Sequence, residues 1–555
     1  MDNKGFLPAP LCPHDKLGKK WEVLSQSTKR VPLRLTMEQQ EIIRSNKLWW
    51  PETQPTAMKT EWLFIGKNKN ELHHSFKGKI SEAAKSGIAY SFLITGGKQR
   101  AMPHTYYSQA ADINVDACQK VFATEIDCPE IFWLQLGGKE IFDKYGTRLA
   151  PDPSTQSAVR LWPQPCIIWT GEPHTVADHL AQLVFLKQAF AQNAGLSCIV
   201  GVSNWKYRCM RPFFAGPASK VKRAKNYKPE QDCRYIFWGS IPPEVARMRQ
   251  AEGSQIKIAE DGFIRSLGLG LLGEAPLSIT CDERYSYFDA RGESRLERLL
   301  QTAHFDDALI DRAKKLRQKI ISLRLSKYNL QQKNDQVLTN IGNKKKILVV
   351  GQVEDDQSIA FGSAAIKKNQ DLLKTVRQAY PDALIAYKPH PDTLTGLRPG
   401  TIDEKIIAGN CDQYLMDHDI IDAIDWCDTL CTITSLAGFE AIIRQKHVVC
   451  YGQPFYSGWG LTDDIFPLAR RKMKRSLDEL VAATLILYPQ YIHPPTQLPC
   501  PPEIVIDWLA QKRHEKPTLR RTLEQKLKRA KTYTLFWCGS VWQHRPRWQK
   551  TGKHN

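Results

Sequence analysis

Residues 429–452 read TLCTITSLAGFEAIIRQKHVVCYG, and this stretch decides the fold class. An apolar run at 429–434 is followed by apolar residues at helical spacing from 436 to 444, and a second apolar run spans 447–452. Strands that alternate with helices of about ten residues indicate parallel βαβ units. We therefore expect a doubly wound α/β sheet whose ligands bind beyond the carboxyl ends of its strands.

The same alternation continues towards the amino terminus. Strand-like runs at 346–351 and 383–388 flank a helical pattern, and three more lie at 198–202, 235–239 and 255–259. We expect two doubly wound lobes that face a cleft, with a basic loop at 220–228. The predicted organisation begins with an irregular arm (1–60) and an accessory α/β domain whose role the sequence does not reveal (61–195). A first lobe (196–330), a second lobe that opens with a linker (331–510) and a basic tail (511–555) follow.

Composition excludes several classes of protein. The chain has 555 residues, of which 42% are hydrophobic and 25% charged, as in globular proteins. No stretch approaches the roughly 18 apolar residues of a membrane span, and the start MDNKGFLPAP lacks the apolar core of a secretory signal. The 14 Cys form no CxxC pair, so we expect reduced thiols, no zinc site and a cytoplasmic location.

The net charge of +20 is unevenly distributed. Residues 512–555 contain 13 Lys or Arg and 2 acidic residues, a net charge of +11. A basic tail with three tryptophans favours docking on the anionic face of the inner membrane. A solvated tail is the alternative, and the absence of zinc spacing or an RNA-binding signature argues against nucleic acid.

Three groups of residues follow predicted strands. Ser435 stands at the expected N-cap of a helix, with Gly438 at the third helical position. Such a helix start suits a phosphate, and Glu440, one turn into the helix, suits ribose hydroxyls. An ordinary cap with a solvated Glu is the alternative. Lys388 and His390 end another strand between prolines and suit a leaving phosphate, although a structurally bonded His would look the same.

The third group is acidic. Glu260 and Asp261 follow a buried strand, and Arg265 comes four residues after Asp261. A carboxylate here can act as a base or nucleophile, with Arg265 holding an acidic substrate. An Asp-Gly turn with a local ion pair is the alternative.

Two weaker signals lie in the second lobe. Gln352 and Glu354 should face the cleft, and the acidic pair 355–356 hints at a divalent metal without a supporting ligand nearby. The glycine- and aromatic-rich loop at 451–464 suits sugar stacking or packing equally well.

In chain order, five motifs form one series: EDGFIRSLGLG (260–270), SKYNL (326–330), GQVEDDQSI (351–359), YKPHPD (387–392) and the segment 435–464. The series closely resembles the bacterial capsule polysaccharide biosynthesis/export family, whose characterised members are β-Kdo glycosyltransferases. The resemblance covers about residues 196–500. Each motif occurs once, whereas members that build a poly-Kdo linker carry two tandem modules, so we expect a single type of linkage.

This resemblance implies a GT-B-like enzyme with the acceptor on the first lobe and the donor, CMP-Kdo, on the second. It would transfer this eight-carbon acidic sugar to a capsule or lipopolysaccharide glycan or glycolipid. The β linkage of the donor would be retained through double displacement, without a metal or other cofactor. Two alternatives are a transferase for another donor, such as CMP-sialic acid or a UDP-sugar, and a non-catalytic capsule export adaptor. Capsule assembly or export proteins are further expected partners.

The resemblance also implies roles for the acidic group. Asp261 would be the nucleophile, and Glu260 would shape its setting or act on the acceptor, with the two roles open to exchange. Arg265 would hold the Kdo carboxylate, while Gln352 and Glu354 would line the cleft.

On the donor side, Lys388 and His390 would face the CMP phosphate. Ser435, Leu436 and Gly438 would present the start of a helix to the donor. Glu440 would bond the ribose.

Overall fold

The computed structural model describes most of residues 166–514, with short gaps of which 246–254 and 330–342 are the longest, and parts of 30–163. The chain forms two compact units. The first contains residues 1–237, 241–256 and 492–500, and the second contains 238–240, 257–491 and 501–555. Most of the predicted arm, the linker up to 342 and the tail from 515 on lie outside the described residues.

A six-stranded parallel sheet is the centre of the second unit. In chain order its strands are β16 (Lys346–Val350), β17 (Leu384–Lys388), β18 (Gln413–Tyr414), β19 (Thr429–Thr432), β20 (His447–Cys450) and β21 (Asp463–Asp464). They lie in the spatial order β18-β17-β16-β19-β20-β21, and every neighbouring pair is parallel. This order reverses direction between β16 and β19, which is the switch point where doubly wound sheets bind ligands.

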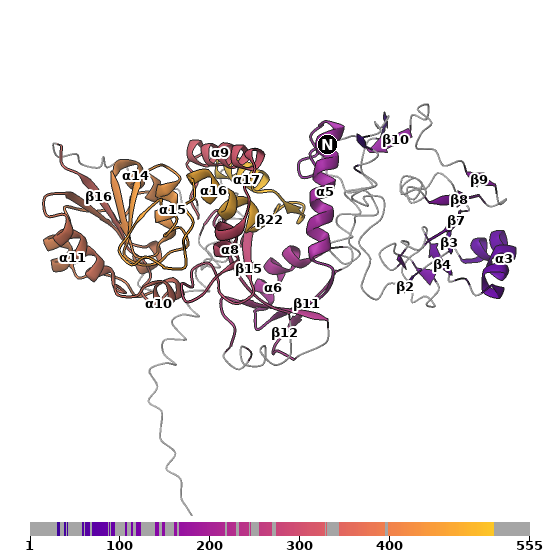
Figure 1. The fold of residues 1–555 in the computed structure, drawn as a ribbon, viewed down its shortest axis with the longest axis horizontal. Helices are drawn as coiled ribbons and strands as arrows, with labels where there is room; N and C mark the ends of the chain where they lie inside the picture. Colours follow the sequence, from indigo (N-terminus) through magenta and orange to yellow (C-terminus); the bar gives the residue numbers. More distant parts are fainter. Residues whose placement is uncertain are drawn as a thin grey trace, which may run out of the picture. The chain divides into compact units, whose positions relative to one another are not determined.

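The apolar sequence of these strands follows from burial on both faces. Ile347 and Val349 of β16 are fully buried in one core with Leu372, Leu373 and Val376. The latter three belong to α11 (Asn369–Ala379), which Figure 1 shows on one side of the sheet, with α14 (Ile420–Trp426) and α15 (Leu436–Ile442) on the other. A parallel sheet covered in this way needs near-continuous apolar strands, as the sequence has.

Short polar caps set the helix starts around the sheet. Asp356 caps α10 (Gln357–Gly362), Asp419 caps α14 and Ser435 caps α15. The remaining helices of this region are α12 (Pro391–Leu394) and α13 (Glu404–Asn410). Each of these cap residues is itself extended, so the helix begins at the residue that directly follows it.

A second layer of the same unit carries the acidic motif. The end of β14 (Gln255–Asp261) pairs antiparallel with β15 (Ser278–Asp282), and β15 pairs antiparallel with β22 (Gln490–Ile492). The helices of this layer are α8 (Arg295–Thr302), α9 (Asp307–Ser322), α16 (Leu477–Val481), the π-helical turn η5 (Ala482–Leu487) and α17 (Pro502–His514).

The first unit contains two further groups of parallel strands. β11 (Gly195–Val200) pairs with both β12 (Ser219–Ala224) and β13 (Cys233–Trp238), and α6 (Asn204–Met210) and the 3₁₀ turn η3 (Arg211–Phe214) connect β11 to β12. Nearer the amino terminus, six strands lie in the order β5-β4-β3-β7-β8-β9, and all neighbours except β8 and β9 are parallel.

The strands of that amino-terminal sheet are β3 (Trp62–Gly66), β4 (Tyr90–Ile94), β5 (Tyr106–Tyr107), β7 (Lys120–Ala123), β8 (Glu140–Phe142) and β9 (Arg148–Leu149). Two-stranded pairings join β1 (Arg30–Leu33) to β10 (Arg160–Pro163) and β2 (Met58–Lys59) to β6 (Ile113–Asn114). The helices of this part are α3 (Lys69–Lys85) and α5 (Val176–Gln192).

The α/β class and the parallel sheets are confirmed, whereas the GT-B arrangement and the domain boundaries stay predictions. One expectation is wrong: residues 220–228 do not form a loop throughout, because 219–224 are the edge strand β12. Alternation of exposed Lys220 and Lys222 with half-buried Val221 is a strand pattern that the high charge obscured. Among the described helices, none is long and apolar enough to cross a membrane.

A buried ion-pair network fixes the loop after β20 to α8. Glu297 accepts hydrogen bonds from the guanidinium groups of Arg470 and Arg471, at 2.5 and 3.1 Å. The side chains of Glu297 and Arg471 are only 3% and 2% exposed. Arg471 also donates to the carbonyl oxygens of Pro454 and Ser457, so one guanidinium holds both the helix and the loop.

We expect Glu297→Gln to lower the free energy of unfolding by about 3–5 kcal/mol, because it leaves the buried Arg471 charge uncompensated. Urea unfolding followed by tryptophan fluorescence measures this change. The matched control is Glu293→Gln, which removes an exposed pair with Arg298 and should cost less than about 1 kcal/mol. Equal losses in the two variants would contradict the network's role.

Candidate active site

Gln352 joins the two central strands at the switch point of the parallel sheet. It follows β16, and its side-chain oxygen accepts a hydrogen bond from the backbone N–H of Thr434, which follows β19, at 2.8 Å. Its side-chain nitrogen donates to the Thr434 hydroxyl at 3.0 Å. Gln352 is therefore buried as a brace that fixes the loop before α15, and it also lines the adjacent cavity.

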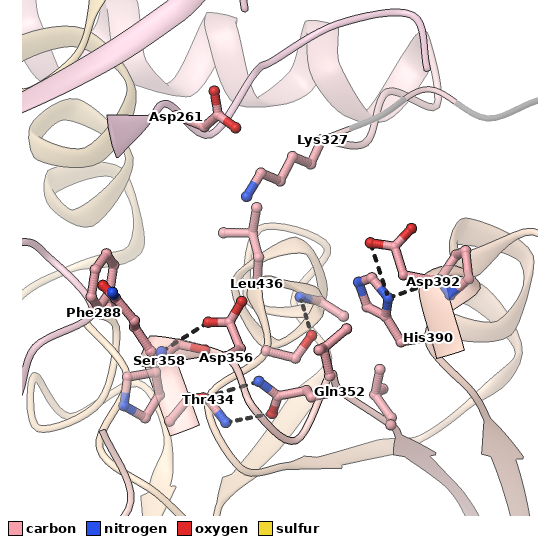
Figure 2. A pocket seen from close by; sticks show the side chains of 18 of the residues that line it. Asp261, Phe288, Lys327, Gln352, Asp356, Ser358, His390, Asp392, Thr434 and Leu436 are labelled. Atoms are coloured by element: carbon pink, nitrogen blue, oxygen red, sulfur yellow. Dashed lines mark hydrogen bonds and ion pairs between the residues drawn. The ribbon is translucent and has the colours of Figure 1, made fainter. Parts of the chain in front are cut away.

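A cavity of about 580 Å³ opens at this switch point. Its wall comes from the segments that follow β16, β17 and β19, from the end of β14 and from the turn at 326–327. Figure 2 shows Asp261 and Lys327 on one side, with Gln352, Thr434 and His390 on the other. Strand ends far apart in the sequence thus meet around one space, as the parallel topology predicts.

Asp261 lies in this cavity with one oxygen engaged. Its Oδ2 accepts a hydrogen bond from Nε of Arg265 at 2.7 Å, whereas its buried Oδ1 has no hydrogen-bond partner within the described structure. Arg265 is buried, donates as well to the Ser266 hydroxyl and the Glu274 carbonyl, and does not line the cavity. The local ion pair is therefore present, and it orients a carboxylate that still faces the cavity.

Glu260 lines the cavity beside Asp261. Its Oε2 accepts a hydrogen bond from the Asp261 backbone N–H at 3.2 Å. Close to it is Gly239, whose φ of 78° lies in the left-handed region that favours glycine. Both carboxylates of the acidic motif are thus brought to the cavity.

Two basic side chains lie at the end of β17 and just beyond it, on the opposite wall. Lys388 is buried and donates to the Met416 carbonyl at 3.0 Å, and burial lowers the pKa of its ammonium to about 8. Burial also lowers the pKa of His390 below its usual 6.5, against the opposing charge of Asp392. His390 Nδ1 accepts the Asp392 backbone N–H at 3.1 Å, so in the neutral ring the proton is on Nε2.

The turn at Ser326–Asn329 ties the two walls together. The Lys327 N–H donates to Oε1 of Glu440 at 2.9 Å, and the Lys327 carbonyl accepts the backbone N–H groups of Arg265 and Ser266 at 3.2 and 3.4 Å. Asn329 adopts a φ of 48° and donates its side-chain amide to the Ser266 carbonyl. Glu440 lines the cavity, but part of its carboxylate serves this link; burial raises its pKa.

The start of α15 forms another part of the wall. Ser435 is its N-cap, with the hydroxyl accepting the Ala437 N–H at 3.2 Å, and both Ser435 and Leu436 line the cavity. Gly438 is the third helical residue but does not line the cavity, because it faces Tyr456: a Cβ there would lie 2.2 Å from the Tyr456 hydroxyl oxygen. The contact with Tyr456 by itself requires a glycine at this position.

Other predicted residues serve the scaffold. Glu354 does not line the cavity, because its Oε1 accepts the Asn369 N–H at the start of α11. Asp355 pairs with Arg398 at 2.6 Å, and Asp356 caps α10. The two carboxylates that suggested a metal site are thus engaged in an ion pair and in a helix cap. The described residues contain no cluster of three potential metal ligands.

Packing dominates the glycine- and aromatic-rich loop. Tyr456 and Trp459 are fully buried, and Trp459 lies under the Arg471 guanidinium. Phe455 lines the cavity while its ring packs against Phe263. Only the start of this loop therefore reaches the candidate site.

Lys327 is one of the cavity residues that sequence reasoning missed. Figure 2 shows its side chain extending into the cavity between Asp261 and the His390 side. The motif SKYNL belongs to the series of five, but nothing in its spacing places a lysine opposite strands that begin twenty residues later. Asp392 and Arg398, which also line the cavity, were missed in the same way.

Comparison with known proteins gives this site a family. Residues 235–491 match the family described as capsule polysaccharide biosynthesis protein. The lipopolysaccharide-processing protein LpsZ of Rhizobium meliloti is 38% identical over 320 residues, which cover 55% of this chain and 72% of LpsZ. The chain belongs to the capsule polysaccharide biosynthesis protein family.

Other relatives carry informative descriptions. The capsule polysaccharide modification protein LipA of Neisseria meningitidis is 41% identical over 333 residues, or 59% of this chain and 47% of LipA. The chain thus spans about half the length of LipA. A solved structure described as a β-Kdo 2,4 transferase, KpsC of Thermosulfurimonas dismutans, is 28% identical with a TM-score of 0.51, covering 56% of this chain and 97% of that one.

Within this family fold, we expect Gly438→Ala to lower the stability of the second unit by about 1–3 kcal/mol, because the new methyl group collides with Tyr456. Adding Tyr456→Phe should recover part of the loss, since the nearest atom is the hydroxyl oxygen. Thermal unfolding of the unaltered protein, the single variant and the double variant measures both effects.

Gly409→Ala is the matched control. This glycine lies in α13, and no atom lies within 4 Å of the position that a Cβ would take there. Alanine should therefore leave the protein equally or up to about 1 kcal/mol more stable. A Gly438→Ala variant as stable as the control would refute the packing explanation.

Proposed function

We propose that the second unit is a retaining glycosyltransferase that moves Kdo from CMP-β-Kdo to a sugar hydroxyl of a capsule or lipopolysaccharide glycan or glycolipid. One observation carries the proposal: the Asp261 carboxylate, with Oδ2 held by Arg265 and Oδ1 without a hydrogen bond, lies across a cavity from Lys388 and His390. Membership of the family and the similarity to KpsC support the same chemistry.

In the first step, the Asp261 carboxylate attacks the anomeric carbon of Kdo through one of its oxygens. The bond from that carbon to the phosphate oxygen breaks, and CMP leaves with the electron pair. A nearby carboxylate stabilises the oxocarbenium-like charge that develops at the carbon and then traps it as an ester. Arg265 fixes the carboxylate's orientation in advance, which lowers the entropic cost of reaching the attack geometry.

In the second step, a hydroxyl of the acceptor attacks the same carbon from the opposite face. The bond to Asp261 breaks, and the carboxylate leaves as the new glycosidic bond forms. Glu260, which also lines the cavity, takes the proton of the hydroxyl as a general base. Two inversions at one carbon give net retention.

Donor binding uses the opposite wall. Lys388 and the Nε2–H of His390 stabilise the charge on the departing phosphate, and Ser435 and Leu436 contact the nucleotide at the start of α15. Glu440 is available to a ribose hydroxyl. No metal is needed for this step, because these groups supply the positive charge and hydrogen bonds.

The Kdo carboxylate needs a cation of its own. The family resemblance assigns it to Arg265, but Arg265 is buried against Asp261 and does not reach the cavity wall. Lys327 lines the cavity on the side of Asp261. We therefore assign the Kdo carboxylate to Lys327 and the orientation of the nucleophile to Arg265.

The covalent step gives a direct test. We expect Asp261→Asn to reduce CMP release from CMP-Kdo by at least about 1,000-fold, since it removes the nucleophile. Glu260→Gln should release about one equivalent of CMP rapidly and then stall, because the acceptor is not deprotonated. Intact-protein mass spectrometry of that variant should find one added Kdo, and peptide mapping should locate it on Asp261.

The contrary outcomes are distinct. A Kdo adduct on Glu260, in a variant that keeps this residue, would show that the two carboxylates exchange roles. CMP release by Asp261→Asn at the rate of the unaltered protein would exclude Asp261 as the nucleophile. Asp289→Asn is the control for a general loss of acidic charge, because Asp289 pairs with Arg291 and does not line the cavity.

Phosphate binding should depend on pH through Lys388. Its pKa of about 8 means that the ammonium loses its proton as the pH rises through 8, so CMP should bind about fivefold more weakly at pH 9 than at pH 8. Burial keeps His390 neutral over this range. Isothermal titration of CMP from pH 7 to 9.5 measures the profile.

Lys388→Met should bind CMP weakly with a flat profile. Lys374→Met, on the exposed side of α11, should keep the profile of the unaltered protein. A flat profile in the unaltered protein would remove Lys388 from the phosphate site.

A further inference from the structure

A second charged feature lies in the first unit, outside the cavity. Residues 201–228 contain eight Lys or Arg and no Asp or Glu. They include α6 and β12, which pack together: the Tyr207 hydroxyl donates to the Val221 carbonyl at 3.0 Å, and Arg223 donates to the Val202 carbonyl at 3.3 Å. The cations of this stretch are therefore collected on one part of the fold.

β12 presents its charges along an edge. It pairs with β11 on one side only, and Lys220 and Lys222 are exposed. Because side chains alternate along a strand, these two lysines share a face at a spacing of roughly 7 Å. Lys225 and Lys228, also exposed, extend the row beyond the strand. Within the described part of the chain, none of these four lysines pairs with a carboxylate.

α6 adds an aromatic ring to the same region. Trp205 is 41% exposed, and its side chain is the largest in size among the exposed apolar side chains that the structure describes. Arg208 is three residues further on, so it shares the helix face of Trp205 and is also exposed. The hydrogen bond from the Tyr207 hydroxyl to the Val221 carbonyl holds α6 against β12, so Trp205 and Arg208 belong to an element beside the lysine row. A large amphipathic ring beside guanidinium and ammonium groups is typical of surfaces that enter a lipid headgroup layer.

We propose that this basic surface (Trp205, Arg208, Lys220, Lys222, Lys225 and Lys228) docks on a membrane that contains anionic lipids. The cations bind the headgroup phosphates, and Trp205 inserts at the level of the headgroups. Lysines on an edge strand also prevent strand pairing between molecules, but that function requires neither the exposed Trp205 nor Arg208. The proposal does not depend on the Kdo chemistry, and it identifies a membrane contact separate from the basic tail.

The test compares two charge-matched variants of the full chain. K220Q/K222Q/K225Q removes three cations of the basic surface. K314Q/K367Q/K374Q removes three exposed lysines of the second unit and is the control. Both keep the tail. Flotation with 3:1 POPC:POPG vesicles and with pure POPC vesicles at 0.1 M NaCl measures binding, and thermal unfolding checks that the variants are folded.

We expect the first variant to bind the anionic vesicles on the order of 100-fold more weakly than the control, at about fivefold per lysine. Trp205→Ser should lose roughly tenfold. Pure POPC should bind none of the proteins measurably. Equal binding by the two triple variants would overturn the proposal.

A second arm uses soluble anionic oligosaccharide and duplex DNA as competing ligands. If the first variant lost affinity for one of these while its vesicle binding matched the control, the surface would recognise that polyanion and the membrane proposal would be wrong. Unchanged affinity for both, with the loss confined to vesicles, supports it.

Discussion

The main chain of Lys327 is the link on which the candidate site depends. Its N–H donates a hydrogen bond to the Glu440 side chain in α15, and its carbonyl accepts hydrogen bonds from the N–H groups of Arg265 and Ser266. One residue thereby fixes the loop that orients Asp261 relative to the helix that begins at Ser435. A reaction between two carboxylates on one wall and a nucleotide on the other requires such a fixed separation, because small displacements of reacting groups strongly slow catalysis.

The two walls differ in how burial acts on their charges. On the sheet side, burial lowers the pKa values of Lys388 and His390 and raises that of Glu440, so each group is held in a setting that disfavours its charged form. A phosphate entering the cavity would restore the favourable charge on Lys388. Asp261, by contrast, keeps a guanidinium partner. The site therefore pairs a wall that gains from binding an anion with a carboxylate whose orientation is already fixed by Arg265.

Much of this was predictable because a parallel sheet converts sequence order into position. The strand ends containing Gln352, Lys388 and Ser435 meet at the switch point simply because β16, β17 and β19 are neighbours. Contacts between distant segments were not predictable. Gly438 packs against Tyr456, which lies further along the chain and reaches it only after the chain has folded back, and Lys327 enters the cavity through a turn held by Glu440. The order of strands in a parallel sheet says nothing about the accessory region or the tail.

The position of the nucleotide phosphate decides whether this cavity is the donor site, and a crystal structure of the chain with CMP bound measures it. We expect the phosphate within hydrogen-bond distance of Lys388 or His390, beside the start of α15, with Asp261 facing it across the cavity. CMP bound with its phosphate away from both residues, or an empty cavity at saturating CMP, would contradict this placement.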